Sequence, residues 1–388
     1  MIRCTIGVFA HNEAHNVRGA LHALLTQRPQ NAEIVEIVVV ASGCTDGTVE
    51  LAEEVASAFP IVSVDVERQR TGKASAIRRL MSIARGDVIV LVGADTLPDP
   101  MAIEHLLEPF ADPSVGMTGA RVVPLNAPTT WLGFTVQMLW HAHHRLALRS
   151  PKLGELVAFR NVIDDFPEDT STDEPALEAL IAKRGYRLVY TPKAVVYNRG
   201  PQTVREFMTQ RRRICAGQVR IALRFGYLTS SMRVRHLVPL ALEAIKNYPS
   251  FLAWTLGAMS LELGARLLGA VDAVRGSETI VWRTAASTKV LTRSSAPLTL
   301  IFISWSPGAI DSEAMLRDLQ RLPEPGAVFW YDVHHGEMLL RLEAAESPLE
   351  SIQDRVERVT RLHVVSEDLT PSASVSCRLV KLSPPLAT

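Results

Sequence analysis

The segment VIVLVGADTLPDP, Val88–Pro100, decides the fold of this 388-residue chain. Its first part, Val88–Val92, is a run of β-formers that predicts a buried parallel strand. Gly93–Thr96 follows at the strand's end, and two prolines then turn the chain away. Ligands of open α/β sheets bind beyond the carboxyl ends of the strands. Asp95 is therefore a candidate ligand of a divalent cation or a ribose, although a turn carboxylate bonded to its own backbone explains this segment alone equally well.

Strands and helices alternate along the chain before this segment. Runs of β-formers predict strands, and apolar residues at helical spacing predict helices. Strands are expected at Ile2–Phe9, Glu33–Val40 and Ile61–Val66, and helices at Val17–Leu25, Val49–Phe59 and Ala74–Ala84. This order predicts a parallel, doubly wound α/β sheet. The loops that follow three of its strands, Ala10–Glu13, Ala41–Thr48 and Gly93–Thr96, should form one pocket at the same sheet edge.

The composition is that of a globular chain long enough for two or three domains: 47% of the residues are hydrophobic, 21% are charged, and the net charge is zero. Asp164–Glu178 holds seven acids and no base, whereas Lys183–Arg235 holds 13 basic residues and one acid. Such a pair of segments suits a cation and a phosphorylated ligand, and we expect no nucleic-acid partner. Four scattered cysteines favour a reducing compartment, and no signal peptide is expected.

Six segments carry a family resemblance. They are FAHNEAHNV (9–17), VVVASGCTDGT (38–48), RTGKASAIRRL (70–80), GDVIVLVGADTLPDP (86–100), STDEPALEALIAKRGYRLVYTPKAVVYNRGP (171–201) and QRRRI (210–214). In this order and spacing they resemble the family-2 nucleotide-sugar glycosyltransferases, inverting enzymes with a GT-A fold. Within that family they resemble the synthase-like branch that carries a Gln-x-x-Arg-Trp motif. The resemblance covers residues 1–230, which we expect to form a GT-A domain with a mostly parallel sheet.

The resemblance implies a binding site for a nucleotide-sugar donor. Ser42 stands where the family has an acid that contacts the uracil or ribose, and Arg70 and Lys73 match its basic pair near the nucleotide. A solvated helix start is the alternative explanation of these two cations. The candidate donor-binding residues are Ala10, Asn12, Glu13, Ser42, Arg70, Lys73 and Asp95.

The resemblance also implies a divalent cation. The family has an Asp-x-Asp motif, but this chain reads Gly93-Ala94-Asp95 and keeps only the second acid. The second acid is the family's metal ligand, so Asp95 is expected to hold Mg²⁺ or Mn²⁺ together with the diphosphate of the donor.

Asp173 and Glu174 are the candidates for the catalytic base. They open a helix expected at Ala176–Arg184, where acids also simply complement the helix dipole. The family places an acid pair here, and alignment on Gly185-Tyr186 puts Glu174 at the position of the base with Asp173 beside it. Two adjacent carboxylates are expected to raise each other's pKa, which suits proton abstraction near neutral pH.

Gln210 and Arg213 are expected to face the diphosphate and the acceptor. They lie three residues apart in a helix predicted at Val204–Phe225 and therefore share a face. A surface basic patch explains Arg211 and Arg212 more simply. Ile214 replaces the family's tryptophan.

Weaker candidates lie between these motifs. A helix expected at Trp131–Leu148 carries His141, His143 and His144, for which acceptor contact or partial burial is a more ordinary explanation than metal binding. The segment Gly154–Arg160 matches a strand near the acceptor in the family. Glu155 and Arg160 are its candidate site residues.

Residues 231–286 are expected to form an apolar helical segment. Ser250–Val271 is long enough to cross a bilayer, but Glu262 and Arg266 would be costly there. A membrane-surface helical pair and a buried helix are the alternatives.

Residues 287–388 are expected to form a small, ferredoxin-like α+β domain. Their pattern predicts the order βαββαβ, with a hairpin turning at His334–Gly336. The expected strands are Leu298–Ser304, Ala327–Val333, Glu337–Leu342 and Ser374–Leu382, and the expected helices are Asp311–Leu322 and Pro348–Leu362.

Together these features predict a metal-dependent inverting glycosyltransferase of hexosyl or N-acetylhexosaminyl type, acting in polysaccharide biosynthesis. It would transfer sugar from a nucleotide-sugar to a glycan or lipid-linked acceptor, in the cytoplasm and peripherally at the inner face of the cell membrane. The alternatives are a polyprenyl-phosphate sugar synthase and a catalytically silent sugar-nucleotide-binding regulator.

Overall fold

The computed structural model describes residues 1–127, 129–247, 251–276, 286–289, 298–305, 315, 326–332, 337–343 and 375–382. The chain divides into two compact units, Met1–Leu291 and Thr292–Thr388. The finer division predicted from the sequence, with boundaries at 230/231 and 286/287, stays a prediction.

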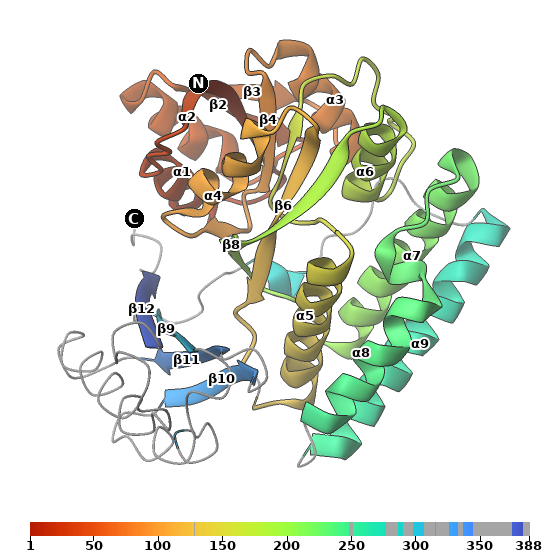
Figure 1. The fold of residues 1–388 in the computed structure, drawn as a ribbon. Coiled ribbons are helices and arrows are strands. Elements are labelled where there is room, and N and C mark those ends of the chain that lie inside the picture. The colour runs from red at the N-terminus through yellow and green to blue at the C-terminus, as the bar shows by residue number, and fades with distance from the viewer. Residues whose placement is uncertain are drawn as a thin grey trace. The chain divides into compact units, whose positions relative to one another are not determined.

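An eight-stranded sheet forms the centre of the first unit (Figure 1). Its strands are β1 (Ile2–Ala10), β2 (Ala32–Ser42), β3 (Val62–Glu67), β4 (Val88–Gly93), β5 (Leu97–Pro98), β6 (Val115–Pro124), β7 (Val157–Arg160) and β8 (Arg187–Asn198). They lie in the order β3-β2-β1-β4-β7-β6-β8-β5. The pairs β3–β2, β2–β1, β1–β4 and β6–β8 are parallel, whereas β7 and β5 pair antiparallel with their neighbours. The predicted doubly wound, mostly parallel sheet is confirmed.

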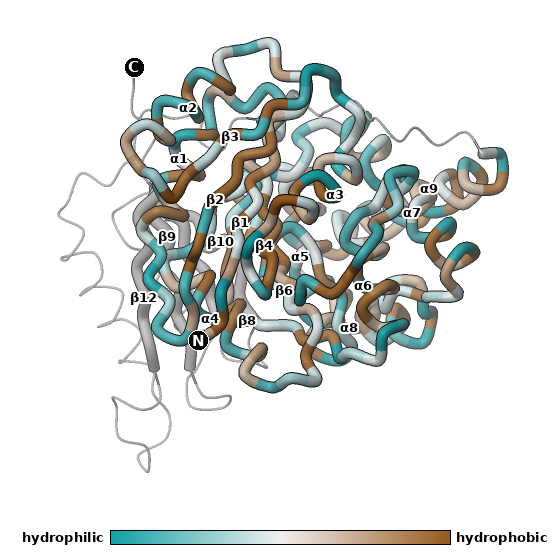
Figure 2. Tube along the Cα trace, turned by 90° about the horizontal axis from the view of Figure 1, so that it is seen from above, coloured by the Kyte–Doolittle hydropathy of each residue, from teal (hydrophilic) through white to brown (hydrophobic). Residues whose placement is uncertain are grey.

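The four parallel strands of the first half bring together the three loops that were expected to form a pocket. Figure 2 shows β3, β2, β1 and β4 side by side. Val88, Ile89 and Val90 of β4 are fully buried, as the run of β-formers predicted. The connecting helices α1 (Val17–Leu25), α2 (Thr48–Ala58) and α3 (Lys73–Ile83) lie within one or two residues of their predicted bounds. The loops after β1, β2 and β4 therefore leave the same edge of the sheet.

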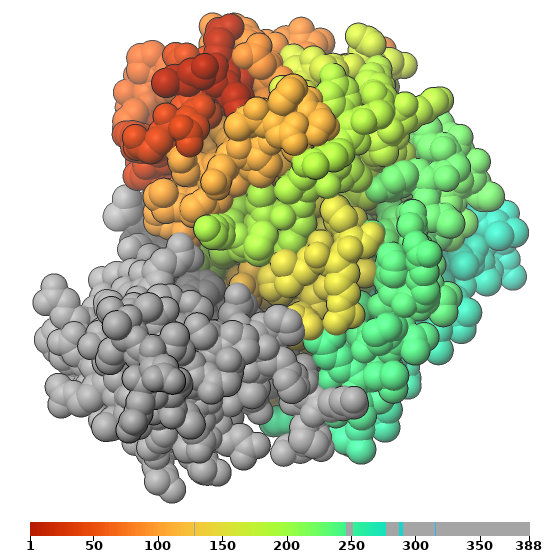
Figure 3. Space-filling model, in the orientation of Figure 1, coloured from red at the N-terminus to blue at the C-terminus, as the bar shows by residue number. Residues whose placement is uncertain are grey.

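Helices of the second half of this unit cover the sheet and extend beyond it. They are α4 (Ala102–Leu107), α5 (Trp131–Arg149), α6 (Asp173–Lys183), α7 (Val204–Phe225), α8 (Val234–Asn247) and α9 (Leu252–Arg275), with short 3₁₀ turns η1 (Glu108–Ala111), η2 (Ser230–Met232) and η4 (Ala286–Thr288). In the space-filling view, α5 and the helices from α7 onward form one continuous surface beside the strands (Figure 3).

Helix α7 starts with a capping box and is held to α9 by buried charge pairs. The Thr203 hydroxyl accepts a hydrogen bond from the Glu206 N–H at 3.2 Å, which satisfies a free donor of the first turn. Farther along, the Arg211 guanidinium donates to Glu262 Oε2 at 2.7 Å. Arg266 Nε donates to Glu262 Oε1 at 2.7 Å, so one carboxylate of α9 receives two guanidinium groups.

Arg211 and Arg212 thus do not form the surface patch that the sequence suggested. Arg212 pairs with Asp272 of α9, with Nε 3.0 Å and Nη2 2.9 Å from its carboxylate oxygens. Both arginines face a second helix because α7 and α9 run side by side, and the long-range partner of each is invisible in a local pattern of three arginines.

Replacing Glu262 by glutamine is expected to lower the free energy of unfolding by about 3 kcal/mol, because two guanidinium groups lose their shared counter-charge. Burial raises the pKa of Glu262, but Arg211 and Arg266 outweigh it and lower the pKa to about 2. The wild type therefore loses this stabilisation as the pH falls from about 4.5 toward 2, and the variant does not.

Chemical denaturation at pH 7 and pH 3 measures both effects. Asp169→Asn is the matched control, because it removes the exposed partner of Arg224 and should cost less than about 1 kcal/mol. Equal losses in the two variants would contradict a special role for the buried triad.

No helix in the described part of the chain has the length and apolar character needed to cross a bilayer.

The second unit contains a four-stranded sheet. Its strands are β9 (Leu298–Trp305), β10 (Gly326–Asp332), β11 (Glu337–Glu343) and β12 (Val375–Leu382), in the order β10-β11-β9-β12. All neighbours are antiparallel, and this is the strand order of a ferredoxin-like βαββαβ unit. The four predicted strands are confirmed. The two predicted helices, Asp311–Leu322 and Pro348–Leu362, lie outside the described residues except for Met315.

Candidate active site

A cavity of about 1160 Å³ opens at the carboxyl ends of the parallel strands. The loops after β1, β2 and β4 line one side of it, and the starts of α3 and α6 together with α7 line the other. It brings together nearly all the residues predicted for the site. They are Ala10, Glu13, Ser42, Arg70, Lys73, Asp95, Asp173, Glu174, Gln210 and Arg213.

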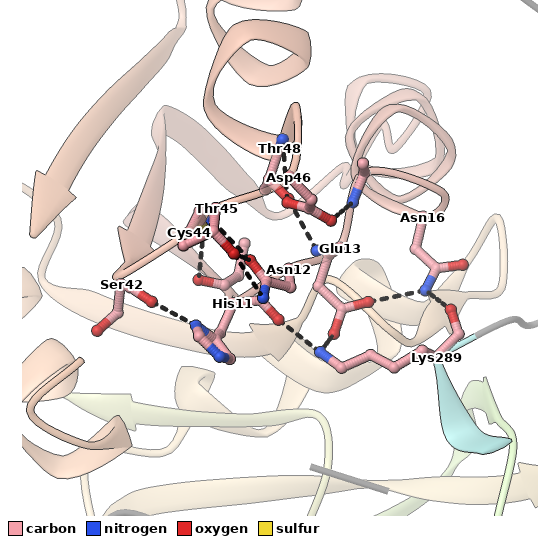
Figure 4. A network of polar contacts seen from close by, with 12 residues as sticks. His11, Asn12, Glu13, Asn16, Ser42, Cys44, Thr45, Asp46, Thr48 and Lys289 are labelled. Atoms are coloured by element: carbon pink, nitrogen blue, oxygen red, sulfur yellow. Dashed lines mark hydrogen bonds and ion pairs between the residues drawn. The ribbon is translucent and has the colours of Figure 1, made fainter. Parts of the chain in front are cut away.

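The loops after β1 and β2 are joined by a network of hydrogen bonds (Figure 4). The Asn12 side chain accepts a hydrogen bond from the Thr45 N–H at 2.8 Å, and its own backbone is in the left-handed region at φ 53°. Asn12 was predicted to contact the donor, but it does not line the cavity. Its amide holds the two loops in register, and contact of Asn12 with the donor stays a prediction.

A short segment, Ala286–Lys289, crosses to this loop from the far end of the unit's sequence (Figure 4). The Lys289 ammonium forms an ion pair with Glu13 and donates to the His11 carbonyl at 2.6 Å. Two residues earlier, Ser287 donates to the Glu206 carboxylate at the start of α7 through its backbone N–H, at 3.2 Å. The segment therefore ties β1's loop to α7. Nothing in the sequence pattern singled out Lys289.

Glu13 is held in a buried position by these contacts. Burial and the nearby Asp95 carboxylate raise the pKa of Glu13 to about 7, and Lys289 only partly offsets them. Asn16 donates to the same carboxylate at 2.8 Å. On the β2 side, the buried Ser42 hydroxyl has no hydrogen-bond partner among the described residues. A ligand hydroxyl or carbonyl in this corner would satisfy it.

Asp95 sits on a tight turn at the end of β4. The Thr96 N–H and hydroxyl both donate to the Gly93 carbonyl, at 3.1 and 2.8 Å, and the Ala94 N–H donates to Phe9 of β1 at 2.9 Å. A Cβ on Gly93 would lie 2.5 Å from the Asp95 carboxylate oxygen. The space of the missing first acid is therefore taken by the carboxylate of the second.

The surroundings of Asp95 fit a divalent cation. Burial and the Asp95 charge raise the pKa of Glu155 to about 7, as they do for Glu13, so three carboxyl groups face one region of the cavity. A cation would relieve their mutual repulsion. The described residues contain no set of three ligating side chains placed to hold an ion alone. Asp95 would therefore share the ion with oxygens of the donor diphosphate, as Mg²⁺ and Mn²⁺ allow.

The Lys73 ammonium forms ion pairs with both candidate bases. Its ammonium lies 3.0 Å from Glu174 Oε1 and 3.4 Å from Asp173 Oδ2. The alternative of a solvated helix start is wrong for Lys73, because this first residue of α3 pairs with two acids in the first turn of α6. The pKa of Lys73 is raised: burial lowers it, but the two carboxylates outweigh that effect.

The sequence predicted that Asp173 and Glu174 raise each other's pKa. The structure supports a raised pKa for Asp173 but not for Glu174. Burial raises the pKa of Asp173 to about 6, with Glu174 adding to this and Lys73 opposing it. Burial also raises the pKa of Glu174, but Lys73 and a backbone N–H outweigh it and the net shift is downward. The prediction is correct for Asp173 and wrong for Glu174, because the cation lies closer to Glu174.

Gln210 and Arg213 both line the cavity from α7, as their spacing predicted. Arg213 Nη1 donates to the Ser171 carbonyl at 3.1 Å, which fixes the guanidinium beside the acid pair. The hydroxyls of Ser171 and Thr172, just before that pair, are buried and have no hydrogen-bond partner among the described residues.

Some of the weaker candidate residues line the cavity and others do not. Glu155 and His143 line the cavity, whereas Arg160 and His144 do not. Arg160 donates to the carbonyls of Val115 and Phe110 at 2.8 and 3.0 Å and so serves the fold. His144 is buried and bonded to the Tyr190 hydroxyl at 2.7 Å, and burial lowers its pKa, which excludes a charged role.

Two protein-family models match the chain. The model described as "Glycosyl transferase family 2" matches residues 5–159, and the model described as "Glycosyl transferase family group 2" matches residues 88–305. The second match alone covers more than half of the chain and includes the region of Asp95, the acid pair, Gln210 and Arg213.

Two curated relatives are similar over part of their length. Poly-beta-1,6-N-acetyl-D-glucosamine synthase of Staphylococcus aureus is 26% identical over 248 residues, which is 61% of this chain and 59% of the relative. Probable glycosyltransferase YdaM of Bacillus subtilis is 23% identical over 233 residues, 56% of this chain and 55% of the relative. The chain thus matches somewhat over half the length of these relatives.

Solved structures with a similar backbone include the mannosyltransferase PcManGT from Pyrobaculum calidifontis, in complex with GDP-Man and Mn²⁺. Its TM-score is 0.47 at 24% identity, over 72% of this chain and 81% of that chain. A second is glucosyl-3-phosphoglycerate synthase from Mycobacterium tuberculosis, with Mn²⁺, UDP and phosphoglyceric acid, at TM-score 0.42 and 17% identity over 57% and 78%. The family-model matches, on a chain with the sheet described above, show that this protein belongs to the family-2 glycosyltransferases and has their GT-A fold.

Proposed function

We propose that this protein is a metal-dependent inverting glycosyltransferase that moves a hexosyl or N-acetylhexosaminyl group from a nucleotide-sugar to a glycan or lipid-linked acceptor. The observation that carries the proposal is the pairing of Lys73 with Glu174 and Asp173 in a cavity that Asp95 also lines. Such a site has a proton acceptor, a cation-binding carboxylate and positive side chains for a diphosphate in one space.

The donor would lie along the carboxyl ends of β1, β2 and β4. The nucleoside would contact Ala10 and the unsatisfied Ser42 hydroxyl, and the diphosphate would lie between Arg70 and Arg213. A Mg²⁺ or Mn²⁺ ion held by Asp95 and the diphosphate would neutralise charge on the leaving group.

Glu174 is the proposed base. Its side chain is 21% exposed, compared with 9% for Asp173, so it can reach an acceptor hydroxyl in the cavity. Glu174 would take the hydroxyl proton while the acceptor oxygen bonds to the anomeric carbon and the bond from that carbon to the diphosphate oxygen breaks. The leaving diphosphate keeps the electron pair. A single displacement of this kind inverts the anomeric centre, and Lys73 keeps Glu174 ionised for it.

Calorimetric titration with a panel of nucleoside diphosphates and nucleotide-sugars, with and without Mn²⁺, tests the proposal. One nucleobase is expected to bind with clear preference, and more tightly when Mn²⁺ is present. Turnover of the preferred nucleotide-sugar, followed by the anomeric configuration of the product, tests the chemistry. Absence of binding to every nucleotide would overturn the proposal.

A membrane surface is the proposed site of action. Helices α8 and α9 expose large apolar side chains at helical spacing, and the arginines just before α8 add positive charge. The exposed residues are Val234, Val238 and Leu242 on α8, and Leu252, Leu256, Leu263, Leu267, Leu268, Val271 and Val274 on α9. An amphipathic pair of this composition suits the headgroup region of an anionic bilayer.

The double substitution Leu256→Glu with Leu267→Glu is expected to weaken binding to vesicles of phosphatidylglycerol and phosphatidylcholine more than tenfold. Each leucine contributes about 1.5–3 kcal/mol when buried. Co-sedimentation measures the effect. Ile83→Glu, an equally exposed apolar position on α3, is the matched control and should bind like the wild type. A wild type that stays in the supernatant would reject the membrane role.

A further inference from the structure

One part of the cavity lining holds a second group of cations besides Arg70 and Arg213. Lys152 lies in the loop between α5 and β7, Arg211 on α7 and Arg266 on α9, and all three line the cavity. Neither arginine was predicted as a site residue, and Lys152 belongs to no motif of the sequence.

The positive charge of this group is only partly balanced. Arg211 and Arg266 share the single carboxylate of Glu262, at 2.7 Å from each Nε. Lys152 forms no hydrogen bond or ion pair with any residue that the structure describes. Glu178 attracts the Lys152 ammonium electrostatically, but its two oxygens also accept hydrogen bonds from the Leu153 N–H at 2.7 Å and the Tyr227 hydroxyl at 3.0 Å.

The Lys152 ammonium is therefore available to bind an anion in the cavity. Burial, Arg211 and Arg266 together lower the pKa of Lys152 to about 8, against the pull of Glu178. An oxyanion placed beside this half-buried ammonium, where Arg211 and Arg266 add positive charge, would form charge-assisted hydrogen bonds and be bound strongly. His143 also lines the cavity, and its buried Nε2 has no hydrogen-bond partner among the described residues.

Next to these cations, the cavity wall becomes apolar. Side chains from three helices form it, and they are Leu139 and Leu146 of α5, Leu240, Ala241 and Ala244 of α8, and Met259 and Leu263 of α9. The base is close by, because Glu174 lies within electrostatic range of Lys152. An acceptor with an anionic group and an apolar chain would match both parts of this lining.

We propose that Lys152, Arg211 and Arg266 form an acceptor subsite that binds the phosphate of an amphiphilic, lipid-linked acceptor, with its apolar chain along α5, α8 and α9. This inference rests on the proposed function, because it assigns the acceptor class of the same site. The subsite would hold the acceptor so that its hydroxyl faces Glu174.

Dodecyl phosphate below its micelle concentration, inorganic phosphate and dodecyl maltoside are the probes. Calorimetry on the full chain is expected to show dodecyl phosphate binding at least tenfold more tightly than either of the others. Lys152→Met is expected to weaken it about tenfold or more, as a charged hydrogen bond requires. Lys152→Arg should restore most of the affinity, and Lys193→Met, an exposed lysine of β8, should have no effect.

Unchanged binding in Lys152→Met, with a normal thermal melt, would overturn the subsite. Equal binding of inorganic and dodecyl phosphate would keep the anion site but reject the lipid chain, and equal binding of dodecyl maltoside would reject the anion. Donor binding, titrated in parallel in the same variants, reports on the proposed function. Failure there leaves a Lys152-dependent signal intact, so the two failures are distinguishable.

Discussion

Replacing Glu174 by glutamine is expected to lower the turnover number of sugar transfer about 10³-fold, while the affinity for the nucleotide donor changes little. The glutamine side chain has the same size but cannot take up a proton. Lys73 keeps Asp173, at 3.4 Å, as its counter-charge, so the diphosphate side of the cavity should stay intact. Steady-state transfer and donor calorimetry on the same preparation separate the two effects.

Asp173→Asn is the matched comparison. Asp173 is more deeply buried than Glu174 and lies farther from the Lys73 ammonium, so its loss is expected to cost only about tenfold in turnover. If Asp173→Asn is inactive and Glu174→Gln is active, the base is Asp173. A wild type that binds its donor without any turnover would favour the silent regulator over the enzyme.

Replacing Asp95 by asparagine is expected to weaken Mn²⁺-dependent binding of the preferred nucleoside diphosphate about 10²-fold, because the amide brings no negative charge to the cation. Binding measured in the presence of EDTA should be the same in the variant and the wild type. The effect is expected to be large because the described residues offer no other set of ligands that could hold the ion without the diphosphate.

Asp87→Asn provides the control on the same stretch of chain. Asp87 is exposed and directly precedes β4, at the opposite end of the strand from Asp95. Its substitution should leave the Mn²⁺ dependence unchanged. If nucleoside diphosphate binding keeps its full dependence on Mn²⁺ in Asp95→Asn, the cation is held by other residues than Asp95.

Local sequence patterns were sufficient to predict the strands and helices of the first half of the chain and their order. Apolar runs bounded by glycine and proline predicted β1, β2, β3 and β4 within two residues, because buried parallel strands consist of continuous β-formers. Parallel pairing then forces the loops after β1, β2 and β4 to one edge, so the meeting of Ser42 and Asp95 in one cavity followed from topology. In the second unit, alternating runs were enough for the four strands of the sheet.

What the sequence did not predict depends on partners distant in the chain. The pKa of Glu174 moves down rather than up because Lys73, 101 residues away, lies 3.0 Å from it. Arg211 was assigned to the surface because its partner Glu262 belongs to another helix. Asn12 bonds to the loop after β2, and Lys289, which no motif singled out, reaches Glu13 across 276 residues. No periodicity records such contacts.

The turn that follows β4 has a consequence for redesign of the motif. Because the carboxylate of Asp95 occupies the volume that a side chain at position 93 would need, Gly93→Asp does not simply add a second ligand to an existing one. The Asp95 carboxylate is the far end of a flexible side chain, so a side chain at position 93 would be accommodated by a new rotamer of Asp95, and the two acids would then lie close together. Adding an acid at position 93 therefore also moves the carboxylate that is already there.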